Sequence, residues 1–226
     1  MAEFTDALFS IFFVETLING LLLGGVLALL SLGLNLVFGV VDVVWICYAE
    51  IIMLGMYTIY FLHVDAGIPV IIAAGCGIAV TTILGLLVHR IVIHYLLDAA
   101  PINQLLATGG LLFFLQGSAM VAFGIEFRNL GVSLGSLIVS EDIYLSWTRI
   151  LCFVLAAGSV GVLYVFLSRS YLGAAIRAIS QDREIMPLMG VDTKKLYLLT
   201  SAIGGALAGL AAALLALQYD VHPFIG

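Results

Sequence analysis

Charged side chains are scarce in this 226-residue chain: 10% of its residues are Asp, Glu, Lys or Arg, while 63% are hydrophobic. A soluble domain of this length cannot hide so much apolar surface, because a folded protein still needs polar groups to cover itself. The eight basic residues form no basic face, which excludes nucleic acid as a partner. We therefore expect an integral membrane protein surrounded by membrane lipid, and the mean hydropathy of +1.23 agrees.

Cysteine and histidine are also rare, with three and four residues. The cysteines lie in apolar runs without metal-ligand spacing, so they indicate small buried side chains and no metal site. Ser118 and Ser136 are flanked by glycine, as a hydrolase nucleophile can be, but every histidine falls at the end of an apolar run or in a loop. No glycine-rich loop ends in Gly-Lys-Ser/Thr. We therefore expect that the chain is not an enzyme.

Long apolar runs make up most of the sequence, and a membrane-spanning helix needs about 20 such residues. Six runs qualify: residues 8–30, 49–63, 68–89, 103–124, 147–168 and 196–217. Between the first two runs, residues 31–48 mix glycine and polar residues with apolar ones: Gly33, Asn35, Gly39 and Asp42. This mixture predicts a re-entrant or interrupted helix. The sequence thus predicts an all-α polytopic protein in which residues 1–226 form a single transmembrane domain.

Basic residues gather in two loops of this arrangement. Arg90 follows the third run, and five others surround the loop between the fifth and sixth runs: Arg169, Arg177, Arg183, Lys194 and Lys195. Lysine and arginine favour the cytoplasmic side, so we expect both loops there. The N-terminus, loop 125–146 and the tail after Gln218 are expected outside. Arg149, at the start of the fifth run, is the exception to this pattern.

Polar groups inside apolar runs are costly and are candidates for function. A polar solute that leaves water must exchange its hydrogen bonds for others, and Asn35, Glu50 and Gln116 are the best candidates for such a pathway. Glu15 and Asn19, one helical turn apart, are further polar residues of the first run. Hydrogen bonding between helices uses the same residue types, so both interpretations stay open for each residue. Their concentration around residues 31–50 favours a pathway.

Two glycine pairs have the spacing that lets helix backbones approach closely: Gly20 with Gly24, and Gly205 with Gly209. Such an interface can be static or moving, and the spacing alone does not distinguish the two.

The longest polar stretch is residues 173–196, GAAIRAISQDREIMPLMGVDTKKL. Its first residues predict a helix, and Ser180 or Asp182 can cap a second short helix that runs through Met189. Glu184 lies in the first turn of that second helix, where negative charge is favourable, and Pro187 limits or bends it.

The end of the same stretch leads into the sixth run. Gly190 suits a helix C-terminus, and Asp192 or Thr193 can cap the helix that follows. A short amphipathic helix therefore lies across the cytoplasmic mouth of two spans. In that position it can transmit movement from a partner.

This loop resembles the cytoplasmic coupling loop of permease subunits in bacterial ABC importers, above all the branched-chain amino acid (Liv-type) permease family. The matching residues, in order, are Gly173, Arg177, Ala178, Asp182, Gly190, Val191 and Asp192. LALLSLGLNLVFGVV, LLATGGLLFFLQGSAMVAFG and ALQYDVHPFIG resemble further segments of the family. After the expected break, the family carries Asn-Phe-Ala-His-Gly-Glu. Residues 45–50 here read Trp-Ile-Cys-Tyr-Ala-Glu, so that only Glu50 matches.

The resemblance implies a permease subunit of an ATP-driven importer in the bacterial inner membrane, carrying branched-chain amino acids or a related small polar solute. It implies as partners a second permease subunit, two cytoplasmic ATPase subunits that bind the ATP, and a periplasmic or lipid-anchored solute-binding protein. It implies no cofactor in this chain. The residues expected to couple to the ATPases are Gly173, Arg177, Asp182, Arg183, Glu184 and Gly190.

Family members continue beyond the position of Gly226 with about two more spans. We therefore expect the C-terminal part of the family's domain to be absent from this chain. The alternative function is a truncated or non-transporting subunit that assembles with partners without conducting.

Overall fold

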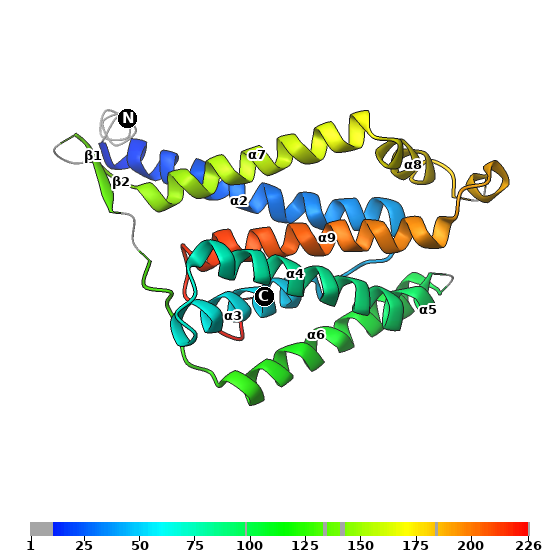
Figure 1. Cartoon of the computed structure of the whole chain (residues 1–226), viewed down its shortest axis with the longest axis horizontal. Coiled ribbons are helices and arrows are strands. Elements are labelled where there is room, and N and C mark those ends of the chain that lie inside the picture. Colours follow the sequence, from blue (N-terminus) through cyan, green and yellow to red (C-terminus); the bar gives the residue numbers. More distant parts are fainter. Residues whose placement is uncertain (1–10, 98, 133–134, 141–142, 184, 226) are drawn as a thin grey trace, which may run out of the picture.

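The computed structural model describes residues 11–97, 99–132, 135–140, 143–183 and 185–225, and its helices run mostly along one long axis (Figure 1). The helices are α2 (Ile11–Val41), α3 (Tyr48–Tyr60), α4 (Val70–Val88), α5 (His94–Leu96), α6 (Pro101–Phe123), α7 (Trp147–Arg169), α8 (Tyr171–Ile179) and α9 (Thr193–Ala216). Short π-helical turns extend α3 and α4, at η1 (Phe61–Asp65) and η2 (His89–Ile93), and η3 (Met186–Met189) is a 3-10 turn. Two strands, β1 (Ser136–Ser140) and β2 (Ile143–Ser146), form an antiparallel hairpin before α7.

Within the described residues, five helices are long and apolar enough to cross a membrane, which confirms the predicted all-α polytopic class. They cover Glu15–Val41, Val70–Leu96, Pro101–Phe123, Trp147–Arg169 and Thr193–Ala216. The predicted run 49–63 instead forms α3, which has 13 residues, together with its short π-helical extension η1. This helix is shorter than the five and is not among them. The prediction of six full-length spans therefore corresponds to five long helices and one shorter one.

The interruption predicted at residues 31–48 is present but begins later than predicted. Helix α2 continues without a break through Val41, so Gly33, Asn35 and Gly39 are helical. The break is confined to residues 42–47. It starts at Asp42, whose φ of 57° lies in the left-handed region that non-glycine residues rarely occupy.

Residues 42–47 run back from the end of α2 into the bundle, where α3 begins (Figure 1). Val43, Trp45 and Cys47 are buried. The Thr108 hydroxyl of α6 lies 2.9 Å from the Val44 carbonyl oxygen and 2.8 Å from the Gln104 carbonyl oxygen of its own helix, so its one hydrogen is shared between them. Non-helical backbone at membrane depth is tolerated where protein surrounds it, and this segment meets that condition.

Helix α9 forms the centre of the bundle and packs against α2, α3 and α4. At Gly205 an added Cβ would lie 2.7 Å from the Thr81 carbonyl oxygen of α4, and at Gly209 it would lie 2.5 Å from the Ile78 Cα. The Gly205–Gly209 pair therefore allows two backbones to approach closely. By contrast, an added Cβ at Gly20 or Gly24 would meet nothing within 4 Å, so this second pair makes no close helix contact within the described part of the chain.

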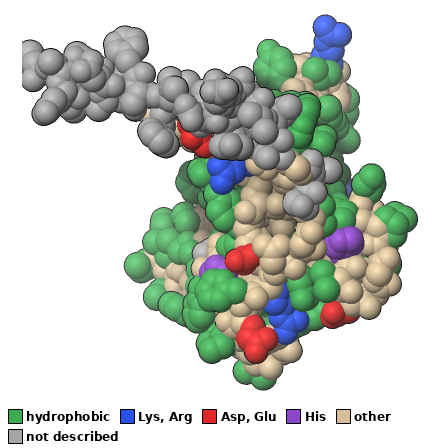
Figure 2. Space-filling model, turned by 90° about the vertical axis from the view of Figure 1, so that its left-hand side faces the viewer, with side chains coloured by type: hydrophobic (Ala, Val, Ile, Leu, Met, Phe, Trp, Pro, Cys, Tyr) green, Lys and Arg blue, Asp and Glu red, His purple; other side chains and the backbone are tan. Residues whose placement is uncertain are grey.

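The two ends of the bundle differ in charge. One end, the basic end, holds the end of α2, the connection from α4 to α6 and the loop from α7 to α9 (Figure 1). It carries six of the eight basic residues: Arg90, Arg169, Arg177, Arg183, Lys194 and Lys195. Figure 2 looks onto the opposite end and shows scattered acidic, basic and histidine side chains where grey atoms do not cover it. By the positive-inside rule, the basic end is expected in the cytoplasm.

Candidate functional site

Glu50 is the pathway candidate that lies in the interior. It is in the first turn of α3 and only 1% exposed. Its Oε2 atom is buried without a hydrogen-bond partner among the described residues. The N-terminus of a helix stabilises negative charge, but an unpaired buried carboxylate is still costly. Glu50 is therefore a group that the fold retains at a free-energy cost, which favours a functional role.

The other two pathway candidates do not join Glu50. Asn35 is exposed on α2, on the side turned away from Gly33 and Val37, which face α9. Gln116 of α6 is half-buried, and its Nε2 lies 3.4 Å from the Pro223 carbonyl oxygen, which ties α6 to the C-terminal tail. The grouping of these three residues in one pathway stays a prediction, and the structure brings none of them into hydrogen-bond contact with another.

Trp45 and Tyr48, which stand where the family carries smaller residues, pack into the core. The Tyr48 hydroxyl donates to the Gly204 carbonyl of α9 at 3.1 Å. It also occupies the space that a Cβ on Gly33 of α2 would need. The Trp45 ring packs edge-on against Tyr48, and its Nε1 donates to the Cys47 sulfur. These side chains hold the break against α2 and α9.

A polar cleft of about 570 Å³ opens at the opposite end, between the start of α2, the start of α7 and the end of α9. Its polar lining residues are Glu15, Asn19, Asn129, Ser146, Thr148, Arg149, Gln218 and Tyr219. The sequence indicated Glu15 and Asn19 as polar residues within a span, and Arg149 as an exception to the charge pattern. It could not indicate that they meet, because 130 positions separate Asn19 from Arg149.

One hydrogen bond fixes the arginine of this polar cleft. Arg149 Nη1 donates to Asn19 Oδ1 at 2.7 Å. Glu15, one turn away on α2, forms no ion pair with Arg149 or with any other described residue. The buried Gln218 Nε2 atom makes no hydrogen bond of ordinary geometry to a described residue, and the Gln218 side chain lies beside the buried Cys152 thiol. The polar cleft therefore holds one cation and one anion.

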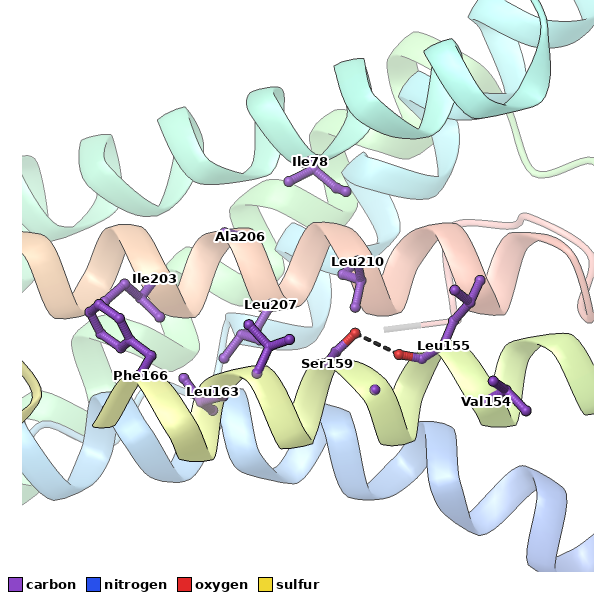
Figure 3. Close-up of a pocket in the computed structure, with 12 residues that line it drawn as sticks. Ile78, Val154, Leu155, Ser159, Leu163, Phe166, Ile203, Ala206, Leu207 and Leu210 are labelled. Carbon is purple, nitrogen blue, oxygen red and sulfur yellow. Dashed lines mark hydrogen bonds between the residues drawn. The ribbon is translucent and has the colours of Figure 1, made fainter. Parts of the chain in front are cut away.

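A second cavity, of about 740 Å³, is a groove between α4, α7 and α9. Figure 3 shows the apolar side chains that line it: Ile78, Leu155, Leu163, Phe166, Leu207 and Leu210. Its one polar side chain, Ser159, donates to the Leu155 carbonyl of its own helix at 2.6 Å. A groove without free polar groups offers nothing in exchange for the hydration of a polar solute.

The helix predicted at the start of the loop between α7 and α9 is confirmed, because α8 forms there at the basic end. We call this loop the coupling loop after its predicted role. Ser170 caps α8 by accepting from the Gly173 N–H at 2.8 Å. Glycine is required at 173 because an added Cβ would lie 2.6 Å from the Phe166 carbonyl oxygen. Ile176 and Ile179 are buried, whereas Arg177 is exposed. The helix thus packs one face on the bundle and presents the arginine on the other.

The second helix predicted in this loop is wrong in its extent. Residues 180–183 form turns, and only the single 3-10 turn η3 precedes Gly190. Pro187, which lacks a donor, and Gly190, left-handed with φ of 79°, limit the helix to this turn. Asp182 accepts from the Ile185 N–H, and Asp192 caps α9 by accepting from the Lys195 N–H, as predicted. Glu184 lies outside the described residues.

Arg183 joins the coupling loop to the break. Its Nη2 lies 3.1 Å from Asp42 Oδ2, and both side chains are partly exposed. Asp42 is the residue at which the backbone leaves α2, so the ion pair connects the loop to residues 42–47. Arg183, which the sequence predicted to contact an ATPase subunit, therefore has an ion-pair partner within the chain. The sequence contains no signal for this pair.

Sequence patterns also did not indicate that apolar residues are exposed at the tip of this loop. Leu188 is 84% exposed and Met189 is 76% exposed, with Ile185 beside them at 52%. They lie in the loop at the basic end, between the end of α8 and the start of α9. An exposed apolar cluster of this kind marks a contact with another protein or with a membrane surface.

Comparison with known proteins agrees with this arrangement. The family model for the branched-chain amino acid transport system permease component matches residues 16–226. The permease protein BraD of a high-affinity branched-chain amino acid transport system in Pseudomonas aeruginosa is 29% identical over 229 residues, which cover 95% of this chain and 74% of BraD. The corresponding LivH of Escherichia coli is 26% identical over 234 residues, covering 96% of this chain and 75% of LivH. No solved structure matches the chain. This chain belongs to the family of permease components of branched-chain amino acid transport systems.

Proposed function

We propose that the chain is the membrane-spanning permease subunit of an ATP-driven importer, which carries branched-chain amino acids or a related small polar solute across the inner membrane. A second permease subunit, two cytoplasmic ATPase subunits and a periplasmic or lipid-anchored solute-binding protein complete the assembly. ATP is bound and hydrolysed by the ATPase subunits, and this chain needs no cofactor. The family of the chain supports this proposal.

The observation that carries the proposal is the connection between the coupling loop and the interior. The Arg183–Asp42 ion pair joins the loop to residues 42–47, and that segment leads directly to Glu50. A displacement of the loop therefore acts on non-helical backbone inside the bundle. Such backbone changes its dihedral angles more readily than a continuous helix, because fewer hydrogen bonds hold it.

The ATPase contact is made by the tip of the loop together with α8. Leu188 and Met189 supply an apolar surface, and the exposed Arg177 supplies charge beside it. Apolar anchors within a charged rim are the usual composition of a protein interface. Arg183 contributes to coupling through Asp42, whereas Arg177 is exposed and forms no ion pair with a described residue.

The test is co-purification in mild detergent with the ATPase subunits of the same cell. We expect the unmodified chain to retain them, and we expect Arg177→Glu and Leu188→Asp/Met189→Asp to lose them. Ile125→Asp is the matched control, because Ile125 is an equally apolar residue, 63% exposed, at the opposite end. Leucine uptake by the reconstituted assembly then tests the substrate.

Three outcomes contradict the proposal. If the unmodified chain associates with no ATPase subunit, or associates with them but supports no solute uptake, the proposal fails, and the second result identifies a subunit that assembles without conducting. If Ile125→Asp lowers association as much as the loop variants do, the contact is not at the basic end.

A further inference from the structure

The polar cleft at the opposite end has the composition of a binding site for a zwitterion. We infer that it binds the backbone of an α-amino acid, with the carboxylate at Arg149 and the ammonium group at Glu15. This inference rests on the proposed function for the class of substrate. The proposed binding site is separate from the three residues that the sequence indicated for the pathway.

Arg149 is prepared to bind a carboxylate. Its bond to Asn19 uses one guanidinium nitrogen and fixes the side chain, so the remaining N–H groups can form a bidentate pair with a carboxylate. Arg149 also lies in the first turn of α7, whose N-cap Ser146 makes no side-chain capping bond. The positive end of the α7 dipole therefore adds to the charge of the arginine.

Glu15 supplies the opposite charge at the same polar cleft. It lies one turn before Asn19 on α2 and lines the cleft, yet it forms no ion pair with a described residue. Because Glu15 and Arg149 do not neutralise each other directly, the space between them is available to a ligand that carries both charges. A ligand with a single charge would leave one of these two groups unpaired.

The other residues that line the polar cleft provide both polar and apolar contacts for a ligand. Thr148 and Gln218 add polar side chains to the lining. Val132, Ala216 and Leu217 provide apolar surface on which an aliphatic side chain can lie. A cleft of about 570 Å³ exceeds the space that one small amino acid needs, so it also admits water or a larger side chain.

The position of the polar cleft suits the first encounter with solute. It opens at the end away from the coupling loop, which is the outer side if the basic end is cytoplasmic. This role also gives a reason for Arg149, which with Arg128 is one of the two basic residues outside the basic end. Arg128 is held by the Phe123 carbonyl and by the Tyr60 and Phe61 rings, whereas Arg149 lines the polar cleft.

The test pairs protein variants with ligand analogues. Binding of L-leucine, L-leucinamide and 2-hydroxy-4-methylpentanoate is measured by ligand-observed NMR titration of the full chain in lipid nanodiscs. Leucinamide lacks the carboxylate and the hydroxy acid lacks the ammonium group. We expect Arg149→Gln to weaken leucine about ten- to hundredfold while leaving leucinamide unchanged. Glu15→Gln should weaken leucine similarly and leave the hydroxy acid unchanged.

Two further variants separate binding from misfolding. Arg149→Lys keeps the charge without the bidentate geometry and should recover part of the affinity for leucine. Arg128→Gln changes the other arginine of the same end, which does not line the polar cleft, and should bind leucine as the unmodified chain does.

The inference is overturned if the unmodified chain does not bind leucine, or if Arg149→Gln weakens leucine and leucinamide equally. It is also overturned if Arg128→Gln weakens leucine as much as Arg149→Gln does. None of these measurements requires ATPase subunits. A failure here is therefore distinct from a failure of the co-purification that tests the proposed function.

Discussion

Replacing Gly205 with alanine places a methyl group against the backbone of α4. The new Cβ would lie 2.7 Å from the Thr81 carbonyl oxygen and 3.0 Å from the Thr82 Cα. Neither atom can rotate away as the end of a side chain can, so α4 and α9 must separate. Overpacking of this kind costs about 1–3 kcal/mol of the free energy of unfolding.

Gly24→Ala is the matched control for this substitution. Both glycines lie within long helices and both belong to pairs spaced by four, but a Cβ at Gly24 meets nothing within 4 Å. Alanine favours a helix over glycine by about 1 kcal/mol at either position, so this gain cancels in the comparison. The difference between the two variants is then the overpacking term alone.

The assay is thermal unfolding of the purified chain in the same detergent. At about 2–4 °C per kcal/mol for a chain of this length, Gly205→Ala should unfold about 2–12 °C below Gly24→Ala. Gly209→Ala should behave as Gly205→Ala does, because its Cβ would lie 2.5 Å from the Ile78 Cα. Equal midpoints for Gly205→Ala and Gly24→Ala would refute the close approach of α4 and α9.

Three further predictions concern the break and the coupling loop. Thr108→Val removes the donor to a carbonyl of the break and should lower the free energy of unfolding by about 1–3 kcal/mol, measured by thermal unfolding. Arg183→Glu should change the free energy of unfolding by less than about 1 kcal/mol, because the ion pair with Asp42 is partly exposed. The same variant should nevertheless impair leucine uptake. The double variant Arg183→Glu/Asp42→Arg, which exchanges the two charges, should restore uptake. The pKa of Asp192 is held below its ordinary value, chiefly by the hydrogen bond from the Lys195 side chain. The helix cap that Asp192 forms is therefore complete above the ordinary pKa of aspartate, and it is lost as the pH falls through the lower pKa of the folded state. Hydrogen exchange of the backbone amides in the first turn of α9 should increase in that pH range. The variant Asp192→Asn should show no such pH dependence.

Features that depend on neighbouring residues could be predicted from the sequence. The length of an apolar run decides whether a helix can cross the membrane, so five runs led to five long helices. Caps are equally local, because a capping side chain bonds to the backbone three residues away. Gly190 and Asp192 therefore end and begin their helices as predicted, and α8 lies where the loop sequence placed it.

Features that depend on distant residues could not be predicted. Gly33 was predicted to interrupt a helix, but it lies within the continuous helix α2. The absence of a side chain at Gly33 instead leaves space for the Tyr48 hydroxyl of α3. The sequence treats Gly24 and Gly205 alike, and only the packing of α4 on α9 distinguishes them.

The sequence by itself determined the membrane class of this protein, the two ends of its bundle and the helix boundaries at either end of the loop between α7 and α9, because apolar length, charge distribution and capping are properties of short segments. Only the tertiary structure decided that Asp42 meets Arg183, and that Glu15, Arg149 and Gln218 line one polar cleft. The physical reason is that these contacts join positions far apart in the chain. They form only after the helices between them have packed.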